Sequence, residues 1–492
     1  MQEENPGPPV VHTFIMATEL SHAQLLNLPK FIREHMAFGQ MPGIRMSDME
    51  AVASSRGHYV EFTSGPERGA YQCSVRVFLE RPMNVEIRSG MGRDEPFEKQ
   101  LENVLLMVVQ FYEEEARKST LYVAFLPGSP KTAKLGRSTS LFRVIFSGNM
   151  MTLFLISILF GVVVLVVMTA LGLSEYAPFV MITVLLVVVL SAGRLSSLRS
   201  PWRITPGARE VVIVQHEVPE GMLQMYVGEF RDRISVAKKN VYDMFRDCPG
   251  DLCAEKVAEV FASAGLPAKP ESFLVKRVDV YGIVESVAKK YNMTVPAIVV
   301  SQDARPNAAA TGFTKSLATM IITMGLLVQL EKEEVEVVVG HELSHLRSAD
   351  PVVLFSLITV EYLARVFFLW QYIVLVPMLM IVYIFGIFWL IFFFGKFLES
   401  RADLEAALVL GKPKVMAESL KKIGFRRLVL SERFLEPGTS RLGEWMKFDP
   451  HPPLYFRIQR LESLDLSNPP KHPFWSSVRA VMSGMAKSGK VA

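Results

Sequence analysis

The segment EKEEVEVVVGHELSHL, residues 331–346, decides how this chain of 492 residues is interpreted. Its acidic start is typical of the first turn of a helix, and its valines and leucines recur at helical spacing. His341 and His345 then lie on one helix face, so both imidazoles can reach a single metal ion. Glu342 lies beside them, where it can take a proton from a metal-bound water. The segment predicts a metal site, although a surface helix can carry this HExxH pattern by chance.

A catalytic zinc ion takes three protein ligands and keeps a fourth position for water. The candidate for the third ligand is Glu399, which begins the segment ESRAD. Asp403 lies one helical turn later, so both carboxylates share a face. Asp403 can accept the distal N–H of a ligand histidine and fix the orientation of that ring. A solvated charge at a helix end is the alternative for Glu399.

Two uncharged stretches, Val144–Ser174 and Tyr176–Gly193, precede the HExxH segment and are separated by Glu175. About 20 apolar residues cross a bilayer as a helix, whereas a buried core helix rarely needs more than about 14. We therefore expect these stretches to form spans one and two of a multi-pass membrane protein.

A second apolar region, Pro351–Gly395, follows the HExxH segment and contains two charged residues, Glu361 and Arg365. Its length fits two antiparallel spans near Val352–Trp370 and Val374–Phe394. Glu361 and Arg365 are four residues apart on the expected helix, so they can neutralise each other. Such a hairpin returns the chain to the side on which the HExxH helix lies. Two spans with a re-entrant pair are the alternative to four spans.

Basic residues flank both hairpins on one side, and the turns within the hairpins contain neither Lys nor Arg. This asymmetry predicts that the termini and the soluble parts are cytoplasmic, in a multi-pass protein of the cell (plasma) membrane. The N-terminus has no signal-peptide pattern, so we expect the first span to act as the membrane signal. The flanking basic residues are Lys131, Lys134, Arg137, Arg143, Arg194, Arg199, Arg203, Arg347, Lys396 and Arg401.

The composition excludes several classes of protein. A hydrophobic fraction of 50% excludes a disordered chain, and a net charge of +4 gives no support for nucleic-acid binding. Three cysteines cannot build a disulfide scaffold and indicate a reducing compartment. Cys248 and Cys253 bracket a turn, but two further zinc ligands do not follow nearby, so we expect ordinary thiols.

The soluble parts mix strands and helices, so we expect an α+β fold class outside the membrane. The expected order is an N-terminal α+β cytoplasmic domain, a linker, a transmembrane hairpin, the first part of a catalytic domain, a second hairpin and the second part of the catalytic domain. These six segments cover residues 1–127, 128–143, 144–193, 194–350, 351–395 and 396–492. In the N-terminal domain we expect strands at Val10–Ala17, His58–Phe62, Gln72–Leu79 and Val85–Arg88, and helices at Ser21–Met36 and Pro96–Lys118, the latter capped by Asp94. In the first catalytic part we expect strands at Glu210–His216, Ala297–Ser301, Ala308–Phe313 and Ala318–Thr323, and helices at Gly221–Phe245, Asp251–Ala264 and Val278–Tyr291.

Several ordered motifs then accompany the HExxH segment. They are PNAAATG at 306–312, TMGLL at 323–327, ExxAD at 399–403 with Ala406-Ala407, and HPP at 451–453 followed by Arg457. From about Val284 to Leu461 this set resembles the integral-membrane zinc metallopeptidases of the HtpX type, a family that also includes the type I CAAX prenyl endopeptidases. The chain departs from the family at Gly395 and Lys396, where the family usually carries Ser-Arg.

The resemblance implies a zincin-like (gluzincin) catalytic domain that binds one Zn²⁺. His341, His345 and Glu399 would be its metal ligands, Glu342 the general base and Asp403 the partner that orients a ligand histidine. His451 would donate to the oxyanion of the substrate, with Arg457 assisting it or anchoring its loop. A surface histidine is the alternative for His451. The residues matched to the substrate-binding strand are Asn307, Ala308, Ala309, Ala310 and Gly312, for which a plain core strand is the alternative.

The resemblance therefore implies a zinc metalloendopeptidase that hydrolyses peptide bonds at the cytoplasmic face of the membrane, in membrane-protein quality control. Membrane or misfolded proteins would be its substrates, and the bilayer rather than a nucleic acid its surroundings. The N-terminal domain lies outside the resemblance and suits regulation, substrate recruitment or oligomerisation. The alternative is a membrane-anchored sensor or scaffold whose zinc site is structural or inactive.

Overall fold

The computed structural model divides the chain into two compact units, residues 1–127 with 211–277, and residues 128–210 with 278–492. Residues 211–277 thus join the N-terminal unit, whereas the sequence assigns them to the catalytic domain. The structure describes residues 10–16, 18–36, 44–47, 49–54, 57–66, 71–89, 94–126, 161, 163–184, 186–187, 202–219, 221–247, 253–301, 303–312, 318–369, 377–424 and 441–490. The predicted linker 128–143 and residue Cys248 lie outside these ranges.

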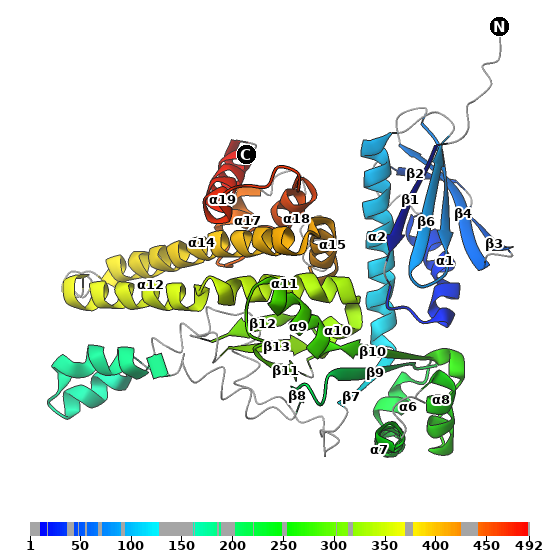
Figure 1. Cartoon of the computed structure of the whole chain (residues 1–492), viewed down its shortest axis with the longest axis horizontal. Helices are drawn as coiled ribbons and strands as arrows, with labels where there is room; N and C mark the ends of the chain where they lie inside the picture. Colours follow the sequence, from blue (N-terminus) through cyan, green and yellow to red (C-terminus); the bar gives the residue numbers. More distant parts are fainter. Residues whose placement is uncertain are drawn as a thin grey trace, which may run out of the picture. The chain divides into compact units, whose positions relative to one another are not determined.

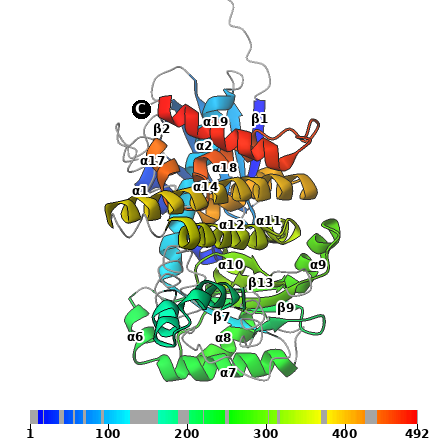
Figure 2. The ribbon, with the colours of Figure 1, turned by 90° about the vertical axis from the view of Figure 1, so that its left-hand side faces the viewer.

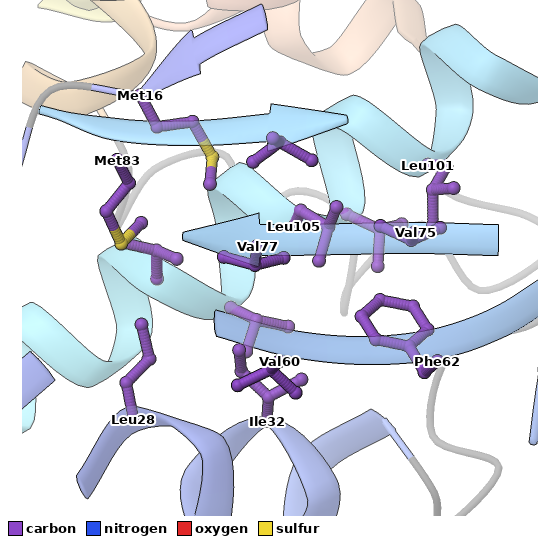
Figure 3. Close-up of a cluster of buried hydrophobic side chains, with 14 of the residues drawn as sticks. Met16, Leu28, Ile32, Val60, Phe62, Val75, Val77, Met83, Leu101 and Leu105 are labelled. Carbon is purple, nitrogen blue, oxygen red and sulfur yellow. The ribbon is translucent and has the colours of Figure 1, made fainter. Parts of the chain in front are cut away.

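The first unit contains an antiparallel sheet of six strands, with the order β1-β6-β5-β4-β2 and β3 paired to β4. The strands are β1 Val10–Met16, β2 Ile44–Met46, β3 Glu50–Ser54, β4 Gly57–Pro66, β5 Cys73–Phe78 and β6 Met83–Ser89. Two helices, α1 His22–Met36 and α2 Glu95–Lys118, supply the other half of the core. Figure 3 shows Val60, Val75 and Val77 of the sheet facing Ile32 of α1 and Leu105 of α2. The helices and four strands expected here are confirmed, including the Asp94 cap, which accepts from Phe97 N–H.

A second, three-stranded sheet in this unit has the order β10-β9-β7. It consists of β7 Thr120–Phe125, β9 Glu210–Glu217 and β10 Phe273–Asp279, and it packs with α6 Leu223–Val227, α7 Arg231–Asp247 and α8 Ala254–Ser263. Strand β7 pairs with β9 in antiparallel register, Thr120 opposite Glu217. This pairing attaches residues 211–277 to the N-terminal unit.

The second unit has a four-stranded sheet in the order β12-β13-β11-β8. Its strands are β8 Arg203–Ile204, β11 Ala297–Ser301, β12 Ala308–Thr311 and β13 Thr319–Thr323. Strands β11 and β13 are parallel, and β12 runs antiparallel to β13 at one edge. Helices α9 Val280–Lys290, α10 Met324–Gln329 and α11 Lys332–Arg347 complete this layer, with α11 in contact with α9 and β12 (Figure 1).

The long helices of this unit follow α11. Helix α12 Asp350–Ala364 continues into the π-helical turn Arg365–Leu369, and α14 Pro377–Leu410 returns beside α12 (Figures 1 and 2). The fourth predicted span is thus the first part of a helix of 34 residues, which continues past the expected end at Phe394. The remaining helices are α15 Pro413–Ile423, α17 Arg441–Met446, α18 Leu454–Glu462 and α19 Pro473–Lys490.

Among the described residues one stretch, Asp350–Phe368, is long and apolar enough to cross a membrane, and only 6% of it is buried. Of the first expected hairpin, residues 163–170 and 177–184 are helical, and most of the rest of 144–193 lies outside the description. The Glu361–Arg365 pair is present at 2.8 Å, and Tyr383 of α14 also donates to Glu361 at 2.8 Å.

Two of the basic residues used to orient the hairpins are buried. Lys396 is 1% exposed and Arg401 is 8% exposed, and both bond to protein groups. Packing within the protein therefore explains these two basic residues, and they are no longer evidence for the side of the membrane. The predicted orientation therefore depends on the other flanking basic residues.

Candidate metal centre

Helix α11 carries the HExxH segment and is well defined at both ends. Glu331 and Glu334 form a reciprocal capping box at its N-terminus, which satisfies two backbone donors that would otherwise lack partners. After the helix, Ala349 takes a left-handed conformation with φ of 55°, unusual for a residue with a Cβ. This turn starts α12 at once and brings Asp350 back toward His345.

Three side chains converge on one point from α11 and α14. His341 Nε2 lies 3.2 Å from His345 Nε2, and each of these atoms lies 3.4 Å from an oxygen of Glu399. A tetrahedral zinc site with bonds of about 2.1 Å requires ligand atoms about 3.4 Å apart. Within the described part of the chain, buried Glu399 Oε2 has no hydrogen-bond partner, which is the expected state of an oxygen that binds a metal. The three residues fit a metal ion of this kind.

The site favours a positive charge between these residues. Burial alone lowers the pKa of His341, but Asp403 and Glu399 outweigh it and raise this pKa to about 10. Burial likewise raises the pKa of Glu399, but His451, His345 and His341 hold it well below its usual range. A metal ion at this point would compete with the proton on His341.

Each ligand histidine is held from behind by an aspartate and an arginine. His341 Nδ1 lies 2.9 Å from Asp403, which accepts two bonds from Arg457 at 2.6 and 2.7 Å. His345 Nδ1 lies 2.7 Å from Asp350. Asp350 in turn accepts from Arg401 at 2.6 Å. The sequence predicted Asp403 as the partner of a ligand histidine, but it did not predict the Arg457–Asp403 pair, Asp350 or the role of Arg401. An Asp-Pro pair three residues after the metal helix was the available signal for Asp350.

Arg457 therefore occupies a supporting position. It is 8% exposed, and its Nη2 lies 3.9 Å from Glu399 Oε2. The sequence led us to expect that Arg457 assists His451 or anchors its loop, whereas the hydrogen bonds of Arg457 go to Asp403 on α14. Its strong bonds to Asp403 keep the pKa of that carboxyl far below its ordinary value despite burial.

Glu342 lies between the metal cluster and the edge strand. Its Oε2 accepts from the backbone N–H of Ala310 at 2.8 Å, and burial raises its pKa. The backbone of Asn307 bonds to Thr323 on β13, so Asn307 and Ala309 face the sheet. Since backbone groups alternate along a strand, those of Ala308 and Ala310 face the open edge.

His451 reaches the cluster from the segment between α17 and α18. Its Nε2 lies 3.4 Å from Glu399 Oε2, its Nδ1 lies 2.8 Å from Asp449 Oδ1, and its side chain is 41% exposed. The structure thus brings together the predicted metal ligands and, around them, Asp403, His451, Arg457 and Glu342, and the predicted substrate strand is linked to them through Ala310. Asp449 was not predicted from the sequence.

Comparisons with known proteins agree with this arrangement. Residues 275–465 match peptidase family M48. A protein named "Protease HtpX homolog" from Chlorobium phaeovibrioides is 30% identical over 209 residues, which cover 37% of this chain and 69% of that protein. The chain belongs to family M48. A second protein of that name, from Thermoanaerobacter pseudethanolicus, is 29% identical over 247 residues and covers 43% of this chain and 79% of its own length.

Membership makes the chain an HtpX-like M48 peptidase, and hence a metallopeptidase by family. The matched region contains α11, the ligand segment of α14 and His451. Residues 1–274, which include the six-stranded sheet, lie outside the matched region.

Proposed function

We propose that the chain is a zinc endopeptidase, embedded in the membrane by several spans, with its active site at the cytoplasmic membrane face. The observation that carries this proposal is the convergence of His341, His345 and Glu399 at 3.2–3.4 Å, with Glu342 bonded to an open strand edge. A metal held by three protein ligands has room for a water, which is the arrangement of a catalytic rather than a structural zinc site.

The chemistry divides among the residues of the chain. Zinc, when bound, would acidify a water and polarise the scissile carbonyl. Glu342 takes the proton on a carboxylate oxygen and passes it to the leaving amine. His451 donates from Nε2 to the oxyanion as an imidazolium, because its other nitrogen, Nδ1, donates its own proton to Asp449 Oδ1. Asp403 and Asp350 hold the rings of His341 and His345 in their binding orientation.

The substrate would bind as an added strand on β12. The outward backbone groups of Ala308 and the outward carbonyl of Ala310 would pair with an extended peptide, whereas the Ala310 N–H is already donated to Glu342, and small side chains allow close approach. Such pairing is independent of the substrate's side chains, which suits cleavage of diverse proteins.

The membrane location is inferred from the helices at the site. The apolar stretch Asp350–Phe368 begins three residues after α11 ends, and α14 continues from the fourth predicted span directly to Glu399. A site at the ends of these helices suits membrane proteins or misfolded segments near the bilayer, and thus membrane-protein quality control. The cytoplasmic orientation rests on the flanking basic residues other than Lys396 and Arg401.

The deciding experiment uses the full chain in detergent with casein and added zinc. We expect the wild-type protein to cleave casein in a chelator-sensitive manner, and Glu342→Gln to lose cleavage while keeping its zinc. Glu336→Gln is a matched control on the same helix and should remain active. An active Glu342→Gln protein, or a wild-type protein that binds zinc without cleaving, would contradict the mechanism; the latter result favours a sensor or scaffold. Unchanged zinc content in Glu399→Ala would disprove the third ligand.

A further inference from the structure

Lys396 is a buried charge close to the metal centre. It lies on α14, three residues before Glu399, and is 1% exposed. Burial lowers the pKa of this lysine to about 8. A buried ammonium requires hydrogen-bond partners, and Lys396 Nζ donates to the backbone carbonyls of Lys447, at 3.3 Å, and Asp449. Its charge is therefore used to hold a segment of backbone.

The preceding residue, Gly395, contacts the same segment. A Cβ at this position would lie 3.0 Å from Pro450 Cβ and 3.3 Å from Pro450 Cα. Pro450 can approach α14 this closely because Gly395 has no side chain. Gly395 and Lys396 are the two positions where the chain departs from the Ser-Arg of the family it resembles, and both departures touch residues 447–450.

A third contact fixes the middle of the segment. Phe448, between the two carbonyls that Lys396 binds, packs against Phe385 and Phe392 of α14 with ring centroids 6.1 Å apart in each pair. The segment is thus attached to α14 by a charged donor and by aromatic packing.

The far end of the segment carries His451. Asp449 Oδ1 accepts both the backbone N–H of His451, at 2.9 Å, and its Nδ1, at 2.8 Å. The side chain of His451 is 41% exposed, so little packing holds it from outside. The contacts run from Lys396 through the backbone of Asp449 to the carboxylate of Asp449 and then to the imidazole.

We propose that Lys396, assisted by Gly395, is a positioning residue that fixes residues 447–451 so that His451 Nε2 faces the metal centre. This inference rests on the proposed role of His451 as a donor to the substrate. Lys396 itself does not touch the substrate. Its loss should therefore affect turnover through His451, and leave the metal ligands in place.

The test compares Lys396→Met, which keeps length and burial but removes the donors, with Lys414→Met, which removes an exposed lysine of α15. Removing one oxyanion donor typically lowers kcat by about 10²–10³-fold. A donor that is misplaced rather than removed should lose about 10-fold in kcat, with KM within about twofold. Zinc content should remain equal in both variants, and Lys414→Met should match the wild type.

A double-mutant cycle separates positioning from general support of the fold. In a His451→Ala background, Lys396→Met should produce no further loss of kcat. An equal loss in both backgrounds would show that Lys396 does not act through His451 and would overturn the proposal.

A second readout does not require activity. Hydrogen exchange of residues 446–452 should become faster in Lys396→Met, while that of α11 stays unchanged. If the wild-type protein fails to cleave, the proposed function fails, and this measurement still decides whether Lys396 holds the segment. If Lys396→Met does not fold, Gly395→Ala replaces it, and it should accelerate exchange in the same residues by displacing Pro450. Unchanged exchange would refute the inference.

Discussion

Replacing Asp403 by Asn tests whether Asp403 orients the imidazole of His341 for metal binding. Oδ1 of Asp403 lies 2.9 Å from His341 Nδ1 and accepts from Arg457 Nη2 at 2.7 Å, while Oδ2 accepts from Arg457 Nε at 2.6 Å. Both oxygens thus face N–H donors. An amide in either orientation would direct its own NH₂ group at one of these donors, so the substitution removes a charge and creates a repulsive contact.

The burial of Asp403, Arg457 and His341 determines two expected effects, one on the free energy of unfolding and one on zinc affinity. Arg457 is 8% exposed, and breaking a buried pair typically costs about 3–5 kcal/mol. Asn retains one acceptor, so we expect about 3 kcal/mol in the free energy of unfolding. Loss of a group that orients a metal-binding histidine typically lowers metal affinity by about 10–100-fold.

The two effects are measured separately. Zinc affinity comes from competition with a chromophoric chelator, and stability comes from urea unfolding of the metal-free protein. Glu336→Gln serves as the control, since it removes a carboxylate that binds Lys412 at 2.9 Å elsewhere on α11 and should leave affinity unchanged.

A double variant, Asp403→Leu with Arg457→Met, separates stability from orientation. Apolar replacement of both partners should recover much of the lost stability, because the unpaired guanidinium is gone. Zinc affinity should remain low, because His341 still lacks its acceptor. Zinc affinity within twofold of wild type in Asp403→Asn would refute the orienting role.

Three further outcomes are expected. Asp350→Asn should lower zinc affinity by about 10-fold in the same chelator assay, because Asp350 holds His345 Nδ1 at 2.7 Å; an unchanged affinity would contradict this. Gly325→Ala should lower the yield of folded protein in size-exclusion chromatography, because its Cβ would lie 2.0 Å from the carbonyl oxygen of Ala304; normal yield would be inconsistent with the β13–α10 turn. Burial, opposed by Arg117 and reinforced by Glu113, raises the pKa of Glu19 from 4.5 to about 7, so its stabilising contribution is complete below about pH 4.5 and is lost as the pH rises through 7. The probe is alkylation of buried Cys73 in a protein with Cys248 and Cys253 replaced by Ser. After correction for ionisation of the thiol, the alkylation rate should increase between pH 5 and 7, because the folded state loses stability. An equally steep increase in Glu19→Gln would show that Glu19 is not its cause.

The sequence predicted local features well because their causes are local. His341, Glu342 and His345 are placed by helical spacing, and Asp94 caps α2 through a bond only three residues long. Strand β7 was missed because its partner β9 lies about ninety residues later, beyond the first apolar hairpin. The same distant pairing explains why residues 211–277 belong to the N-terminal unit.

The supporting residues of the site were harder to predict. The position of Asp350 beside His345 depends on the left-handed conformation of Ala349, which cannot be predicted from an alanine in the sequence. Lys396 follows an apolar span and resembles a topological signal, yet its partners are backbone carbonyls some fifty residues away, which no side-chain pattern identifies. Residues marked by helical spacing or by the family's ordered motifs could be assigned from the sequence, whereas Asp350 and Lys396, whose roles come from tertiary contacts that no motif marks, could not.

The charges around the histidines bear on the kind of ion that the proposed metal site would hold. Asp403 and Asp350 are each neutralised by an arginine at 2.6–2.7 Å, so their role is to orient rather than to attract an ion. Within the described part of the chain, Glu399 and Glu342 have no Lys or Arg at a comparably short distance. The guanidinium of Arg457 lies 3.9 Å from Glu399. Two negative charges therefore remain beside three imidazoles, and a divalent cation balances them where a monovalent one would not. Without that ion a proton on His341 supplies part of the balance, and Asp403 and Glu399 raise the pKa of this histidine against the effect of burial.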